Sequence, residues 1–301
     1  MQSKRPFFCS IEIGFDPMKR ITLNMHCPDK KGIIAAVTNF IHQNKGNIVY
    51  IDQYVDRVQG IFFMRLECEL KEKNFSKSFF SDNFQEVIGE AYAMEFNLFE
   101  NDQKPKMAVF VSKYDHCLYD ILARKASGEL QVDIPFILSN HPDLEPIAKR
   151  FDIPFYHVPV SKENKAEAEK EQLKLLQSHG VDFVVLARYM QIISPKLIAA
   201  FKDKIINIHH SFLPAFPGAK PYHSAYERGV KIIGATSHYV TEELDAGPII
   251  EQDITRVTHL HSIQDFIAKG RDLERIVLSK ALQLHTARKV MVYQNKTVVF
   301  S

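Results

Sequence analysis

The sequence lacks any apolar run long enough to cross a membrane, and charge of neither sign is in large excess. A membrane-spanning helix needs about 20 consecutive apolar residues, and no window of the 301-residue sequence supplies one. The first ten residues, MQSKRPFFCS, contain no apolar core of signal-peptide length. The net charge is only +2, which leaves no broad basic surface for nucleic acid or an anionic membrane. We therefore expect a cytoplasmic protein with neither of these partners.

Cysteine is also scarce. The four cysteines, Cys9, Cys27, Cys68 and Cys117, are scattered along the chain without Cys-x-x-Cys spacing. This pattern argues against a disulfide framework or a zinc knuckle, and it favours a reducing compartment. Hydrophobic residues make up 46% of the sequence and charged residues 25%, which is the balance of an ordinary globular protein. The length is sufficient for two domains.

Residues 19–101 show the pattern of a small α+β domain. Alternating apolar residues predict strands, and apolar residues at helical spacing predict helices. The predicted elements are a strand at 21–27, a helix from 33 that closes at Gly46, strands at 47–56 and 61–70, a helix at 74–93 and a strand at 95–100. This order is that of a ferredoxin-like fold. The polar residues 102–106 are expected to form a linker, and the arm before about Arg20 shows no committed pattern.

Residues 107–301 alternate strands with helices. Near-continuous apolar runs such as 183–186 are typical of strands covered on both faces. The alternation predicts a doubly wound, mostly parallel sheet with helices on both sides. Towards the end of the chain we expect strands at 205–209 and 231–239 joined by a proline-rich loop and a short spacer, a strand at 248–257, a long helix at 262–288 and a single strand at 291–300.

Polar residues cluster where two of these strands end. In the segment IINIHH, Asn207 and His209 share one side of the strand, while His210 points to the other. An amide and an imidazole directed together suit the stabilisation of an oxyanion. The second strand adds His238, and the loop after it adds Asp245. Together these groups suggest chemistry on a carbonyl.

The same stretches resemble a known family. NIHHSFLPAFPGAKPYH followed by GATSHYVTEELDAGPII is similar to the catalytic core of the folate-dependent formyltransferases, and among them most of all to the formyltetrahydrofolate deformylases. CPDKKGIIAAVTNFIHQNKGNI resembles an ACT domain, a ferredoxin-like module that commonly binds amino-acid effectors. SKYDHCLYDIL and VLARYMQIIS lie in the expected order, so the resemblance covers nearly the whole chain.

The resemblance implies a set of site residues. The catalytic group would be Asn207, His209 and Asp245, with His238 beside them. Asn207 and His209 would stabilise the oxyanion, and Asp245 would position and deprotonate the water; either His209 or His238 would return the proton. The folate would contact Leu186, Ala187, Tyr189, Met190, Gln191, Ile192 and Ile193 on one side and Glu243, Leu244 and Ala246 on the other.

The sequence of the turn after the first strand distinguishes the transferases of this family from the deformylases. Transferases that formylate glycinamide ribonucleotide hold the acceptor's phosphate in a glycine-rich turn after the first strand, where free backbone N–H groups bind anions. Residues 111–118 here, VSKYDHCL, contain no glycine. We expect Tyr114, Asp115 and His116 to crowd and repel a phosphate, which leaves water as the acceptor. The implied reaction is hydrolysis of 10-formyltetrahydrofolate to tetrahydrofolate and formate, which would supply purine synthesis and balance one-carbon pools.

Two alternatives remain at this point: a formyltransferase with a nucleotide or another amine as acceptor, and a non-catalytic amino-acid sensor. No metal or redox cofactor is expected, with folate as the substrate. Metal binding through the histidines is disfavoured because no acidic or cysteine partner stands at zinc spacing; the histidines considered are His209, His210, His223, His238, His259 and His261.

The first domain offers a candidate effector site. In the turn before its first helix, free backbone N–H groups could hold an amino acid's carboxylate; the residues concerned are Asp29, Lys31, Gly32 and Ile33. An ordinary charged turn explains the same residues equally well. Domains of this kind commonly pair across subunits, so we expect a homo-oligomer, either a dimer or a tetramer.

Overall fold

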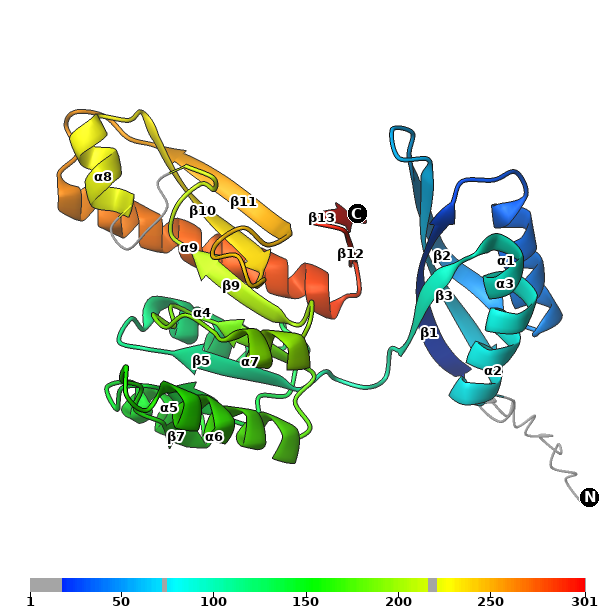
Figure 1. The fold of residues 1–301 in the computed structure, drawn as a ribbon, viewed down its shortest axis with the longest axis horizontal. Helices are drawn as coiled ribbons and strands as arrows, with labels where there is room; N and C mark the ends of the chain where they lie inside the picture. The colour runs from blue at the N-terminus through cyan, green and yellow to red at the C-terminus, as the bar shows by residue number, and fades with distance from the viewer. Residues whose placement is uncertain (1–17, 72–74, 216–220, 301) are drawn as a thin grey trace, which may run out of the picture. The chain divides into compact units, whose positions relative to one another are not determined.

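The chain forms two compact units, one ending at Gln103 and one beginning at Lys104 (Figure 1). The computed structural model describes residues 18–71, 75–215 and 221–300. The division falls inside the 102–106 stretch expected to be a linker. The arm before residue 18 lies outside the described residues.

The N-terminal unit has the predicted ferredoxin-like order. Its four strands form an antiparallel sheet in the order β2-β3-β1-β4. Alternate residues of β1, such as Ile21, Leu23 and Met25, are fully buried and pack with the helices in one core. The elements are β1 (Met18–Pro28), α1 (Ile33–Gln43), β2 (Asn47–Asp56), β3 (Ile61–Lys71), α2 (Lys77–Phe84), the π-helical turn η2 (Gln85–Gly89), α3 (Glu90–Tyr92) and β4 (Glu95–Glu100).

The end of α1 differs in detail from the prediction. The helix stops at Gln43, and the residue with left-handed backbone is Lys45, with φ 58°, rather than Gly46. Gly46 is needed for a different reason: a Cβ there would lie 2.8 Å from Cγ2 of Ile41. The glycine therefore permits close packing against the helix that it follows.

The C-terminal unit contains the predicted doubly wound sheet. Strands β7, β6, β5, β8 and β9 run parallel, and β10 and β11 extend the sheet antiparallel, in the order β11-β10-β9-β8-β5-β6-β7. The bounds are β5 (Met107–Val111), α4 (His116–Ala126), β6 (Ile137–Ser139), α5 (Glu145–Arg150), β7 (Phe155–His157), α6 (Lys165–Ser178), β8 (Phe183–Leu186), α7 (Pro195–Ala200), β9 (Ile205–His209), α8 (Pro221–Arg228), β10 (Ile232–Tyr239), β11 (Ile249–Arg256), α9 (Ile263–Thr286), β12 (Val290–Tyr293) and β13 (Lys296–Val299).

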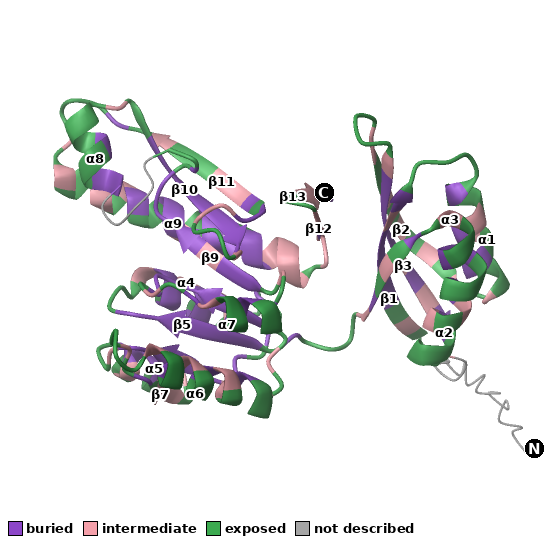
Figure 2. Ribbon diagram, in the orientation of Figure 1, coloured by how far each residue is buried: buried purple, intermediate pink, exposed green. Residues whose placement is uncertain are grey.

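Both faces of this sheet are covered, as continuous apolar strands require. In β5, Met107, Val109 and Val111 pack with α4, α5 and α9, whereas Ala108 and Phe110 pack with α6 and α7. Figure 2 shows these central strands as buried. The predicted fold class is confirmed. Among the described residues, no helix is both long and apolar enough to cross a membrane.

Two predictions near the end of the chain were wrong. The stretch taken as a short spacer contains a helix, α8, which begins at Pro221, a residue compatible with the first turn of a helix. The expected single C-terminal strand is a hairpin of β12 and β13, because Gln294 adopts left-handed backbone with φ 54° and reverses the chain. Residues 216–220 of the proline-rich loop lie outside the described residues.

Candidate active site

Three neighbouring strands place the candidate catalytic residues in one row across the sheet. Asn207 in β9 is paired with Leu186 at the end of β8 on one side and with His238 in β10 on the other. His209 lies two residues further along β9, on the same side as Asn207 because side chains alternate. The loop after β10 carries Asp245 back to this row.

The four side chains meet. His209 Nδ1 lies 3.2 Å from Asp245 Oδ1, and His238 Nε2 lies 3.9 Å from the same oxygen. The Asn207 amide nitrogen lies 3.2 Å from His238 Nε2. His209, His238 and Asp245 are largely buried, with 7%, 3% and 15% of their side chains exposed. The structure therefore brings together all four residues that the sequence singled out.

The hydrogen bonds of His238 fix its tautomer. Its Nδ1 lies 2.9 Å from the carbonyl oxygen of Tyr239, which can only accept, so Nδ1 carries the proton. Burial lowers the pKa of His238 despite the nearby Asp245 carboxylate, which keeps the ring neutral near pH 7. The unprotonated Nε2 then accepts a hydrogen bond from the Asn207 amide. His238 thus holds Asn207 in orientation.

Asp245 is held by an unusual backbone. It adopts left-handed φ of 56°, which aspartate tolerates better than most residues. Two residues later, a Cβ at Gly247 would lie 1.8 Å from the carbonyl oxygen of Tyr239, so only glycine fits there. Partial burial acts to raise the pKa of Asp245, but the hydrogen bond with His209 and the charge of that ring lower it by more, so the carboxyl is ionised. Within the described residues, Nε2 of His209 is buried without a hydrogen-bond partner.

The residues expected to contact folate divide into two groups. Leu186, Ala187, Tyr189 and Ile193 are buried, and three of them belong to the core beside β5. Those that expose large apolar side chains are Met190, Ile192 and Leu244, with 44%, 61% and 63% of their surface accessible. Gln191 and Ala246 are half-buried and Glu243 is exposed. The backbone N–H of Met190 donates to Ser112 Oγ at 3.0 Å, which ties this segment to the end of β5.

The candidate effector turn has the backbone of a helix start. Gly32 precedes α1 with φ 92°, a conformation that favours glycine. Asp29 and Lys31 are exposed, whereas the side chain of Ile33 is buried in the core. Only the backbone of Ile33 is therefore accessible to an effector.

A second polar cluster, missed from the sequence, lies beside the turn after β5. The carboxylate of Glu274 in α9 is 1% exposed, accepts a hydrogen bond of 2.7 Å from the Tyr222 hydroxyl and lies 2.9 Å from His116 Nε2. Arg188 Nε lies 3.3 Å from the same carboxylate. The sequence held one signal: Glu274 falls on the apolar stripe of its helix, among Leu273, Val277 and Leu278.

This cluster leaves a pocket of about 260 Å³, lined in part by Tyr114, His116, Arg188 and Arg271. That Tyr114, Asp115 and His116 crowd and repel a phosphate stays a prediction; Tyr114 and His116 do line the pocket. Asp115 is not among the lining residues. The ring of Tyr114 contacts two guanidinium groups, with centroid distances of 5.0 Å to Arg188 and 5.7 Å to Arg271.

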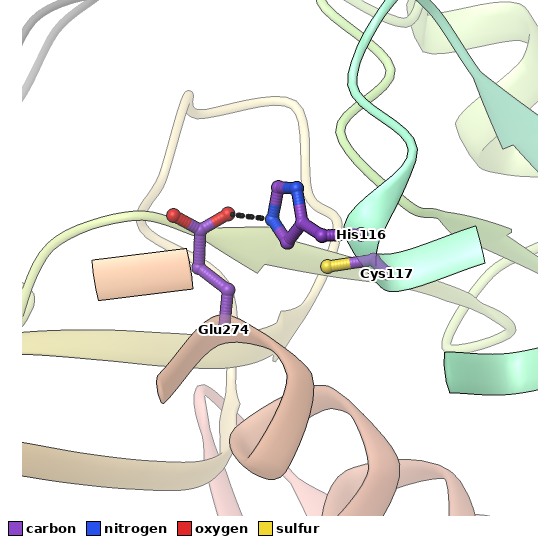
Figure 3. A group of neighbouring side chains, drawn as sticks. All are labelled: His116, Cys117 and Glu274. Atoms are coloured by element: carbon purple, nitrogen blue, oxygen red, sulfur yellow. Dashed lines mark hydrogen bonds and ion pairs between the residues drawn. The ribbon is translucent and has the colours of Figure 1, made fainter. Parts of the chain in front are cut away.

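His116, Cys117 and Glu274 are the one group of described residues whose potential metal-ligating atoms lie together, within 4.8 Å (Figure 3). The chemistry does not suit a cation. Burial raises the pKa of Cys117 well above its ordinary value, which keeps the thiol protonated and a poor ligand. The Glu274 carboxylate is already engaged by His116 and Tyr222, and the Arg188 cation lies beside it. A metal at this position is therefore disfavoured by its neighbours.

The chain is similar to known proteins over nearly its whole length. A family model described as formyl transferase matches residues 105–282, and one described as ACT domain matches residues 21–73. The formyltetrahydrofolate deformylase of Synechocystis is 50% identical over 93% of this chain and 98% of that protein, and the one of Bacillus subtilis is 45% identical over 93% of each.

Solved structures agree. A formyltetrahydrofolate deformylase from Pseudomonas syringae superimposes with a TM-score of 0.90 at 46% identity and covers 96% of both chains. Glycinamide ribonucleotide transformylase 1 from Symbiobacterium toebii matches with a TM-score of 0.63 at 28% identity, over 68% of this chain and 98% of that one. The relatives from Synechocystis, Bacillus subtilis and Pseudomonas syringae match both units and are formyltetrahydrofolate deformylases, and the chain belongs to that family.

Proposed function

We propose that the protein hydrolyses 10-formyltetrahydrofolate to tetrahydrofolate and formate. The observation that carries the proposal is the convergence of Asn207, His209 and Asp245 at the end of β9 in a chain of this family. The formyl group on the folate nitrogen is an amide, so its hydrolysis needs donors for an alkoxide, a positioned water and a proton for the departing amine.

Asn207 and His209 supply the donors. The Asn207 amide gives one hydrogen to His238 and has a second for the alkoxide. Protonated on both ring nitrogens, His209 donates Nδ1–H to the Asp245 carboxylate and presents Nε2–H as the second donor. Removing one such donor from an active site typically costs about 2.7–4 kcal/mol in the barrier.

Asp245 positions the water. Because its pKa is lowered, the carboxylate is a weak base in the ground state, and it accepts the water's proton as the bond to the formyl carbon forms. Collapse of the alkoxide breaks the carbon–nitrogen bond, and the proton that Asp245 took from the water passes to the nitrogen of the departing amine. His238 orients Asn207 and does not transfer the proton, because both of its ring nitrogens are already hydrogen-bonded.

The exposed side chains of Met190, Ile192 and Leu244 supply apolar contact area for the folate. The buried members of the same set, such as Tyr189 and Ile193, contribute backbone groups only. Released formate and tetrahydrofolate would feed purine synthesis and balance one-carbon pools in the cytoplasm. The ACT domain would bind an amino-acid effector at Asp29–Ile33, in a homo-oligomer.

The test is purified protein supplied with 10-formyltetrahydrofolate alone, with formate and tetrahydrofolate as the readout. Asp245→Asn, which removes the base, and His209→Ala, which removes an oxyanion donor, should each lower turnover by about 100-fold or more, while folate binding changes little. His259→Ala, an exposed histidine outside the site, is the control and should keep wild-type turnover. Near-normal turnover in either site variant would contradict the assigned roles. Product that forms only when an amine acceptor is added would contradict hydrolysis.

A further inference from the structure

The tip of the loop that carries Asp245 has little packing of its own. The loop connects β10 to β11, and Glu242, Glu243 and Leu244 in it are exposed. Asp245 itself has left-handed backbone, with φ 56°. A residue in such a sparsely populated conformation persists only where the surrounding structure holds it. The loop therefore needs contacts from other segments to keep the Asp245 carboxylate beside His209.

The C-terminal hairpin supplies such a contact. The turn between β12 and β13 contains Asn295, whose side-chain amide donates a hydrogen bond of 2.9 Å to the carbonyl oxygen of Ala246, the residue after Asp245. Because a carbonyl oxygen can only accept, the amide nitrogen of Asn295 must face it. A second bond, of 2.5 Å, runs from the Thr297 hydroxyl to the carbonyl oxygen of Ile249 at the start of β11. The hairpin thus holds the loop just after Asp245 and again where β11 begins.

Apolar packing gives the hairpin a fixed position in its domain. Val290 and Val292 pack against the central core, and Met291 and Phe300 are only 7% and 3% exposed. The Phe300 N–H also donates, at 2.8 Å, to the carbonyl oxygen of the residue just before β12, which ties the two ends of the hairpin together. The turn at the other end stays exposed and presents Asn295 to the loop. A residue on an anchored hairpin can hold a loop that has little packing of its own.

We propose that Asn295 is a positioning residue for the hydrolysis: through the Ala246 carbonyl it keeps the Asp245 carboxylate in place. In that place Asp245 Oδ1 lies 3.2 Å from His209 Nδ1. The positioning role rests on the proposed function, in which Asp245 is the base, whereas the contact between hairpin and loop does not. The family model described as formyl transferase ends at residue 282, and the hairpin begins at Val290. The contact therefore comes from a segment beyond the region that this model matches.

The informative variant is Asn295→Asp, because aspartate has the same size and the same preference for turns, but an ionised carboxylate cannot donate a hydrogen bond. In the full-length protein its kcat for formate release should fall roughly tenfold, since a misplacement of about 1 Å in an active site can cost about 100-fold. The KM for 10-formyltetrahydrofolate should change by less. Asn295→Gln keeps the amide donor and should recover most of the turnover. Lys296→Ala, an exposed neighbour in the same hairpin, is the matched control and should behave like wild type.

Amide hydrogen exchange in residues 241–248 measures the same contact without substrate. Asn295→Asp should speed exchange in this segment, and Lys296→Ala should not. An unchanged kcat or unchanged exchange in Asn295→Asp overturns the proposal, and so does turnover in Asn295→Gln as low as in Asn295→Asp. Equal losses in Lys296→Ala would also overturn it, because they would assign the effect to the fold of the hairpin. A wild type that releases no formate refutes the proposed function instead, and the exchange result then still decides whether the hairpin holds the loop.

Discussion

Replacing Gly247 by alanine should impair turnover by moving the loop that carries Asp245. A Cβ at this position would lie 1.8 Å from the carbonyl oxygen of Tyr239 and 3.3 Å from Cγ2 of Thr241. Real Cβ atoms essentially never approach within 3.0 Å, so the backbone must shift by about 1.2 Å. The shift strains two contacts, the Tyr239 N–H to Pro248 carbonyl bond of 2.9 Å and the His238 Nδ1–H to Tyr239 carbonyl bond of 2.9 Å.

The size of the effect follows from that displacement. A misplacement of about 1 Å in an active site can cost 100-fold in rate, and overpacking typically costs 1–3 kcal/mol of stability. Formate release should therefore fall by about 100-fold, with a lower urea midpoint. Gly229→Ala is the control, because Gly229 has φ 66° and no atom within 4 Å of an added Cβ: backbone strain alone should cost about 1–2 kcal/mol without touching the site. Wild-type turnover in folded Gly247→Ala would refute the reasoning.

Three further predictions concern buried groups. The burial-lowered pKa of His238 should place the acid limb of turnover below pH 6.5, because protonation at Nε2 would oppose the Asn207 amide hydrogens; a limb above that pH in the pH–rate profile contradicts this. Burial lowers the pKa of His285 from 6.5 to about 3, so the unfolded state takes up the proton first as the pH falls. Wild type should lose about 2 kcal/mol from this residue between pH 6.5 and about pH 5, and His285→Gln should show a shallower fall in its urea midpoint. Gly270→Ala should gain about 1 kcal/mol in helix propensity, yet be net destabilised in the same assay, because its Cβ would lie 2.1 Å from the Tyr222 ring; equal or greater stability contradicts the packing.

Periodicity explains why the strand-borne part of the site could be predicted. Alternation along β9 puts Asn207 and His209 on one side whatever the neighbouring strands are. Asp245 reaches these two residues through a loop, and periodicity does not predict the conformation of a loop. Its place in the site was expected from the resemblance to a known family. The folate contacts assigned by that resemblance stay predictions, since buried Tyr189 and exposed Ile192 come from the same short segment.

The second polar cluster could not be predicted because it depends on contacts between distant segments. Tyr222 reaches Glu274 only because α8 packs at Gly270, where α9 has no side chain. Arg188 reaches the same carboxylate from the end of β8 by way of a left-handed turn. No local sequence pattern predicts these contacts, and α8 was not predicted because a proline-rich segment precedes it. A charged residue on an apolar helix face, such as Glu274, is the signal to seek in similar sequences.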